Sequence, residues 1–130
     1  MRLSYAAIFL TLVVNGAAHA ESRHAVRPLS GAVCMQLAIS PEDTLNPKVG
    51  VPILEAPSAS AHIVSYAATN VIVEAPQQPT AGFLRVVRPT GEKGWIKAGY
   101  LRPWHDPYVP TAECYPAMMS DGKPGFGFTK

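Results

Sequence analysis

The sequence predicts an all-β protein, with a small barrel of about five short strands and extended N-terminal and C-terminal flanks. Three observations favour this class. The chain carries 13 prolines, which disfavour helix interiors. Its apolar residues fall in short runs separated by turn residues. Its 2 cysteines flank these runs, which suits a small barrel closed by a disulfide.

Residues 1–20 are predicted to be a secretory signal peptide. Arg2 precedes an apolar run over residues 5–14, and small residues lead to Ala20, where cleavage is expected. A run of about ten residues is shorter than the roughly 20 that a membrane-spanning helix needs. The mature chain is therefore expected to be periplasmic or secreted, with no stable insertion in a membrane.

The remaining chain divides into three segments. Residues 21–47 contain three prolines and a short apolar patch but no helical stripe, so they are expected to form an extended N-terminal flank. Residues 48–104 are expected to form the barrel, and residues 105–130 a C-terminal flank with a mobile tail. The five apolar runs of the barrel lie at residues 49–54, 61–66, 71–74, 83–87 and 94–97.

The fourth run shows how its strand should face. Alternation places Leu84 and Val86 on one side and Phe83, Arg85 and Val87 on the other. Neither side is wholly polar. Segments from the flanks are therefore expected to cover part of the second side.

Cys34 and Cys114 are expected to form a disulfide, because an even pair in an exported chain is usually bonded. The bond would tie the segment that enters the barrel to the segment that leaves it. Closing so long a loop contributes roughly 4 to 5 kcal/mol in the chain-entropy model. A redox pair normally has Cys-x-x-Cys spacing, which these two residues lack.

Residues 91–101 carry the most specific pattern in the chain. Gly91 stands at a turn, Gly94-Trp95-Ile96 begins a strand, and Tyr100-Leu101 follow, which predicts a tight hairpin and then one turn of 3₁₀ helix. This pattern resembles the end of bacterial SH3-like (SH3b) domains, and the resemblance extends over residues 50–104. It implies a small exported protein that contains an SH3 domain.

Other parts of the barrel segment resemble the family less closely. Ala56-Pro57-Ser58 is similar to the turn that follows the first strand of the family. Pro52-Ile53-Leu54 replaces its usual Asn-Val-Arg, and Phe83-Leu84 replaces a Trp-aromatic pair. These departures thin the aromatic surface through which such domains recognise ligands.

The resemblance implies a non-catalytic binding module that contacts cell-wall peptide (peptidoglycan) or a protein partner. Residues 83–104 hold five basic residues against one acid, whereas the whole chain has a formal net charge of +2. The last hairpin is therefore expected to offer a basic face, although a solvated surface would look the same. Trp95 is expected in the core. The expected contact residues are Arg85, Arg88, Lys97, Tyr100 and Trp104.

An alternative interpretation is a small accessory or structural subunit of a larger periplasmic complex, such as an oxidoreductase, whose partner would order the tail. An enzyme is not expected, because no nucleophile and base stand in a recognisable pattern. The histidines are too scattered to predict a metal site, and no cofactor is expected. A nearly balanced charge does not favour nucleic acid.

Overall fold

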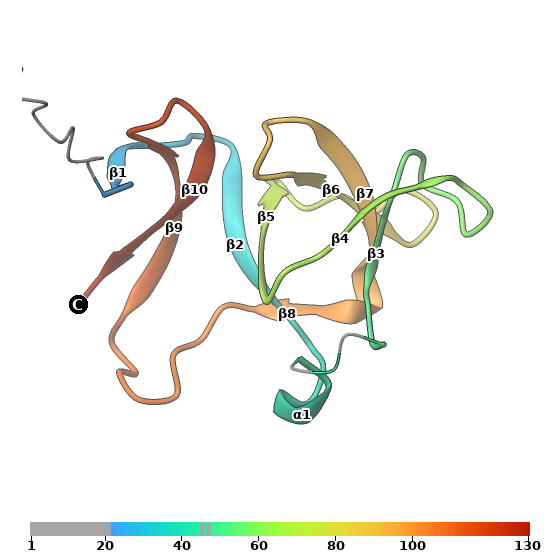
Figure 1. Cartoon of the computed structure of the whole chain (residues 1–130), viewed down its shortest axis with the longest axis horizontal. Helices are drawn as coiled ribbons and strands as arrows, with labels where there is room; N and C mark the ends of the chain where they lie inside the picture. Colours follow the sequence, from blue (N-terminus) through green and yellow to red (C-terminus); the bar gives the residue numbers. More distant parts are fainter. Residues whose placement is uncertain (1–21, 45, 47) are drawn as a thin grey trace, which may run out of the picture.

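The computed structural model describes residues 22–44, 46 and 48–130. It is all-β, with two antiparallel sheets that hold ten strands among the described residues (Figure 1). The expected signal peptide lies outside the described residues. Within the part of the chain that is described, no helix is long and apolar enough to cross a membrane.

The larger sheet has seven strands rather than the five expected. Their order is β4-β3-β7-β6-β5-β2-β8, so β4 and β8 form its two edges. β2 pairs with both β5 and β8, which brings a segment expected to be a flank into the main sheet. The strands are β2 (Ala32–Leu37), β3 (Pro52–Leu54), β4 (Ile63–Tyr66), β5 (Asn70–Glu74), β6 (Phe83–Val87), β7 (Lys93–Lys97) and β8 (Leu101–Pro103).

The smaller sheet joins the two flanks. β1 (Ala25–Pro28) and β10 (Pro124–Thr129) pair with opposite edges of β9 (Glu113–Met119). A mobile tail was expected at the end of the chain, whereas residues 124–129 pair with β9 at every position. Figure 1 shows this sheet beside β2, with a long loop leading to it from β8.

Two short helical turns connect the strands. α1 (Pro41–Thr44) follows β2, and η1 (Ala98–Tyr100) is a turn of 3₁₀ helix between β7 and β8. The tight hairpin and the 3₁₀ turn expected from residues 91–101 are therefore confirmed. Gly91 has φ +90 in the β6–β7 turn, a conformation that glycine adopts at little cost.

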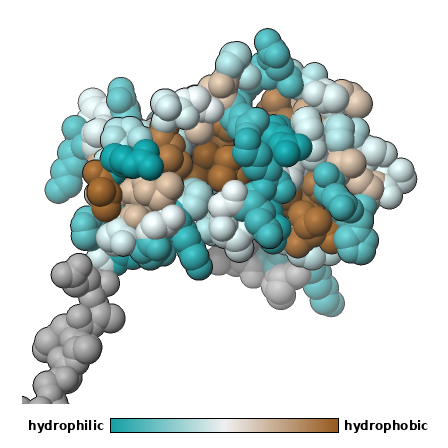
Figure 2. Space-filling model, turned by 90° about the horizontal axis from the view of Figure 1, so that it is seen from above, coloured by the Kyte–Doolittle hydropathy of each residue, from teal (hydrophilic) through white to brown (hydrophobic). Residues whose placement is uncertain are grey.

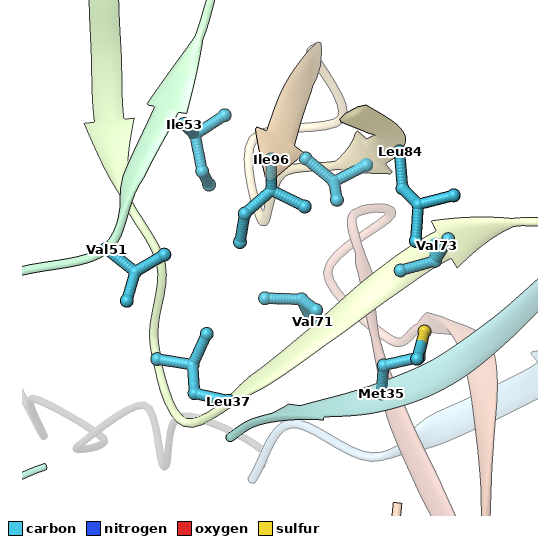
Figure 3. Close-up of a cluster of buried hydrophobic side chains, with 9 residues drawn as sticks. Met35, Leu37, Val51, Ile53, Val71, Val73, Leu84 and Ile96 are labelled. Carbon is cyan, nitrogen blue, oxygen red and sulfur yellow. The ribbon is translucent and has the colours of Figure 1, made fainter. Parts of the chain in front are cut away.

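The core lies on one face of the larger sheet, where side chains from its central strands converge (Figure 3). Leu84 and Val86 of β6 both lie in this cluster, so the predicted alternation of that strand is confirmed. Two members come from β2, which shows that the core begins before residue 48. The buried cluster comprises Met35, Leu37, Val51, Ile53, Val71, Val73, Leu84, Val86 and Ile96.

The expected disulfide is present and links the two sheets. Cys34 lies on β2 and Cys114 on β9, with their Cα atoms 6.0 Å apart. Cys34 pairs in register with Ile72, and both alternate with core residues, so they point away from the core. The smaller sheet therefore covers part of the second face of the larger sheet, as expected for the flanks.

Candidate functional site

The smaller sheet leaves part of the second face of β6 and β7 uncovered. We call this part, where Arg85, Trp95 and Lys97 lie beside Tyr100 of η1, the hairpin face. Its side chains alternate with the core residues Leu84, Val86 and Ile96. Cross-strand pairing places Phe83 opposite Lys97, Arg85 opposite Trp95 and Val87 opposite Lys93. This geometry gathers aromatic and basic side chains on adjacent strands.

Arg85 and Trp95 form the centre of the hairpin face. The guanidinium carbon of Arg85 lies 4.9 Å from the centre of the Trp95 ring, within the range of a cation–π contact. Both side chains are half-buried. Trp95 was expected in the core, and the reason for the error is local: Ile96 is buried, so its neighbour along the strand must face the other way.

Lys97 and Tyr100 form a second pair of the same type at the end of the hairpin. The Lys97 ammonium lies 5.8 Å from the centre of the Tyr100 ring. Lys97 is exposed, and Tyr100 is 41% exposed. The short η1 turn brings Tyr100 back beside the strand that it follows.

Arg88 does not belong to the accessible part of this surface. Its guanidinium bonds the Glu92 carboxylate at 2.8 Å across the β6–β7 turn and donates to the Val64 carbonyl at 3.5 Å. Only 17% of its side chain is exposed. Lys93 is similarly paired with Glu74. Among the described residues, Arg85 and Lys97 have no carboxylate within ion-pair distance, so both present an unpaired positive charge on the hairpin face.

A hollow of about 330 Å³ lies beside Arg85 and Trp95. Its other walls come from β5 and from the segment that follows it, including Glu74, Pro76 and Gln78. A ligand group that enters this hollow would meet the guanidinium and the indole together.

Trp104 lies apart from the hairpin face. Its ring centre is 5.5 Å from that of Phe128 on β10, and it lines a different groove that also contains Tyr108. The structure thus separates the five predicted residues into three settings: Arg85, Lys97 and Tyr100 on the hairpin face, Arg88 in a turn, and Trp104 in a second groove.

The described residues were also compared with the donor sets that metal ions and cysteine nucleophiles require. They contain no group of three or more histidine, cysteine, aspartate or glutamate residues that could hold a metal ion. Both cysteines are bonded to each other, so neither is a free nucleophile.

Asp121, in the turn between β9 and β10, has a carboxyl group whose pKa is lowered. The backbone N–H of Lys123 donates to Asp121 and lowers its pKa, and the side chain of Arg23 lowers it further. Partial desolvation acts in the opposite direction. The Arg23–Asp121 ion pair anchors the chain before β1 to the turn between β9 and β10.

No protein-family model, curated protein or solved structure matches this chain. The surfaces described above are therefore the basis for its proposed function.

Proposed function

We propose that the chain is a non-catalytic exported binding module of the SH3-like type, which recognises a carboxylate-bearing cell-wall peptide through the hairpin face. The observation that carries this proposal is Arg85, which stacks on Trp95 without a carboxylate partner among the described residues. An acidic segment of a protein partner would offer the same chemistry.

The physical argument rests on how guanidinium groups bind anions. Arginine presents its donors in a planar fork that matches a carboxylate, and stacking on an aromatic ring holds that fork in place. Trp95 also supplies apolar area for the neighbouring part of a peptide. Lys97 beside Tyr100 provides a second site of the same kind at one end of the hairpin. Two such sites suit an extended ligand with more than one carboxylate.

The SH3-like assignment has support from the connection after the hairpin. A single 3₁₀ turn leads from β7 into β8, which returns to pair with β2 near the start of the described chain. The larger sheet has two strands more than the family pattern led us to expect. The two additional strands are β2 and β8, which lie next to each other at one margin of the sheet.

The test is co-sedimentation with purified cell walls. The double variant Arg85→Glu/Lys97→Glu should reduce retention about tenfold or more, because both free cations become acids. The control is Arg27→Glu, a charge reversal at an exposed site on β1 in the other sheet. Retention should also weaken as salt rises. Equal retention of the double variant and the control would refute the hairpin face as the binding surface.

A second candidate function is the accessory subunit of a larger exported complex. The observation that favours it is β4, an edge strand with the exposed apolar side chains Ile63, Val64 and Tyr66. Such an edge is suited to pairing or packing with another chain.

Affinity purification from native envelope separates the two functions. A protein partner recovered near equal stoichiometry, and lost in Tyr66→Glu, would favour the subunit. Deleting residues 118–130 would be uninformative, because it removes β10 and the end of β9.

A further inference from the structure

The long loop between β8 and β9 lines a groove of about 570 Å³ together with residues of β2, β5 and β10. We call it the C-terminal groove. Its walls come from the loop and from the end of β10, and its floor includes Gln36 of β2 and Asn70 of β5. Figure 2 shows that hydrophobic residues reach the surface in separate patches between hydrophilic ones, so the molecule has more than one apolar surface. The volume is within the range of small-ligand sites.

The groove is held open by hydrogen bonds within the protein. The Asp106 carboxylate accepts the backbone N–H groups of Tyr108 and Val109, at 2.8 and 3.1 Å. The amide of Gln36 donates to the His105 carbonyl at 2.9 Å, which fastens the loop to the larger sheet. These bonds fix the loop before any ligand arrives, so binding costs little ordering.

Aromatic side chains form the walls. Trp104 packs against Phe128 with an interplanar angle of 42°, and both line the groove. Tyr108 is 92% exposed, far more than its phenol ring would be in a packed core. Three aromatic residues on one lining, one of them this exposed, provide flat surfaces for a ligand with apolar C–H faces.

One hydrogen-bond acceptor of a floor residue has no donor. The Asn70 Oδ1 atom is enclosed and has no hydrogen-bond partner in the described part of the chain. An enclosed amide oxygen without a partner is unfavourable, and Asn70 lines the groove, so a ligand hydroxyl that reached this oxygen from the groove would remove the cost. The charged residues on the lining are one acid and one base, Asp106 and Lys130, and the acid already accepts two N–H groups.

From these features, we propose that the C-terminal groove binds a neutral saccharide. Sugar rings present C–H faces that stack on aromatic side chains, and their hydroxyl groups both donate and accept hydrogen bonds. A proline-rich peptide would also suit aromatic walls, but it brings few N–H donors to Asn70. The lining holds one lysine, Lys130, and no arginine, so it lacks the planar donor fork that favours carboxylate and phosphate groups. The site uses no residue of the hairpin face, so it stands independently of the function proposed above.

The two tryptophans make the proposal testable in one spectrum. The chain contains 2 tryptophans, Trp95 on the hairpin face and Trp104 in the groove, so each site has its own indole N–H resonance. The probe is an N-acetylglucosamine tetrasaccharide added to the ¹⁵N-labelled protein. It should shift the Trp104 resonance saturably and leave the Trp95 resonance in place. A Trp104→Phe variant assigns the signals.

Variants identify the contacts. Tyr108→Ala should weaken saccharide binding roughly five- to tenfold, because the lost ring is an exposed stacking surface. Its matched control is Tyr66→Ala, which removes a 61% exposed tyrosine from β4 and should leave the affinity unchanged. Asn70→Ala should also weaken binding, through loss of the acceptor.

Three outcomes would overturn the proposal. The first is no saturable shift of the Trp104 resonance at millimolar saccharide. The second is equal affinity of Tyr108→Ala and Tyr66→Ala. The third is a shift of the Trp104 resonance by a proline-rich peptide and not by the saccharide. The hairpin-face hypothesis is tested separately: it fails if the Arg85→Glu/Lys97→Glu variant is still retained on cell walls, whatever the result with the saccharide.

Discussion

Ile53 on β3 fills the space into which a side chain at Gly94 on β7 would project. Its Cγ2 atom would overlap a Cβ atom at Gly94, and the Leu54 carbonyl oxygen lies 3.3 Å from the same position. β3 and β7 pair only at Leu54 and Trp95, so this close approach is part of how the two strands meet. The glycine before Trp95 is therefore a packing requirement as well as a sequence motif.

Gly94→Ala should consequently destabilise the protein by about 1–3 kcal/mol, because the added methyl group forces buried Ile53 and nearby backbone to move. Chemical denaturation monitored by tryptophan fluorescence measures the loss. Gly99→Ala is the matched control, since nothing lies within 4 Å of a Cβ atom there. Equal stability of the two variants would show that β3 and β7 can separate without cost.

Removing the disulfide should cost roughly 4 kcal/mol, the value expected for a loop of this length. Cys34→Ala/Cys114→Ala tests this by thermal unfolding, with the reduced wild-type protein as a comparison. The smaller sheet should lose amide-exchange protection first, because the covalent link to β2 is gone. Faster exchange in β6 and β7 than in β9 would contradict this order.

The Asp121 carboxyl should titrate below its ordinary pKa of 3.8. A carboxylate whose pKa is lowered by folding stabilises the native state above the unfolded pKa, and this contribution disappears as pH falls through the folded pKa. NMR titration of the side chain measures the shift. Arg23→Gln should return the pKa only partly, because the backbone N–H of Lys123 is the larger cause. Full return to the ordinary value would assign the shift to Arg23 alone.

Arg88 and Lys97 should separate stability from binding. Arg88→Gln removes the bonds to Glu92 and Val64 and should cost about 1 kcal/mol or less, since Glu92 is largely exposed. It should leave wall retention unchanged. Lys97→Gln should lower wall retention and leave the melting temperature unchanged. Loss of retention in Arg88→Gln at normal stability would return Arg88 to the contact surface.

Local patterns in the sequence were sufficient for several features. The alternation of β6 and the turn of 3₁₀ helix after β7 depend on neighbours within a few residues, so they were predictable. The disulfide followed from cysteine number and the expected export of the chain. The orientation of Trp95 depends on which of two adjacent apolar residues is buried, and the structure shows that this residue is Ile96.

Features that depend on distant partners were not predictable. β2 belongs to the larger sheet because it pairs with β5 and β8, which are far from it in sequence. β10 alternates glycine with phenylalanine, a weak strand signal in isolation. Position 127 requires glycine because the Tyr115 ring on β9 occupies the space that a side chain there would take. The separation of Trp104 from the hairpin face also follows from β10, which supplies Phe128.

The pairing of β1 with β9 also sets an order of events for a chain that is made from its N-terminus. Ala25 is among the first described residues to emerge, and its register partner Met119 is among the last. β1 must therefore stay unpaired until β9 is available. The larger sheet has all its strands by Pro103 and can form earlier. Assembly then ends where the two flanks meet, and the thiol of Cys34 stays open to wrong partners until Cys114 arrives.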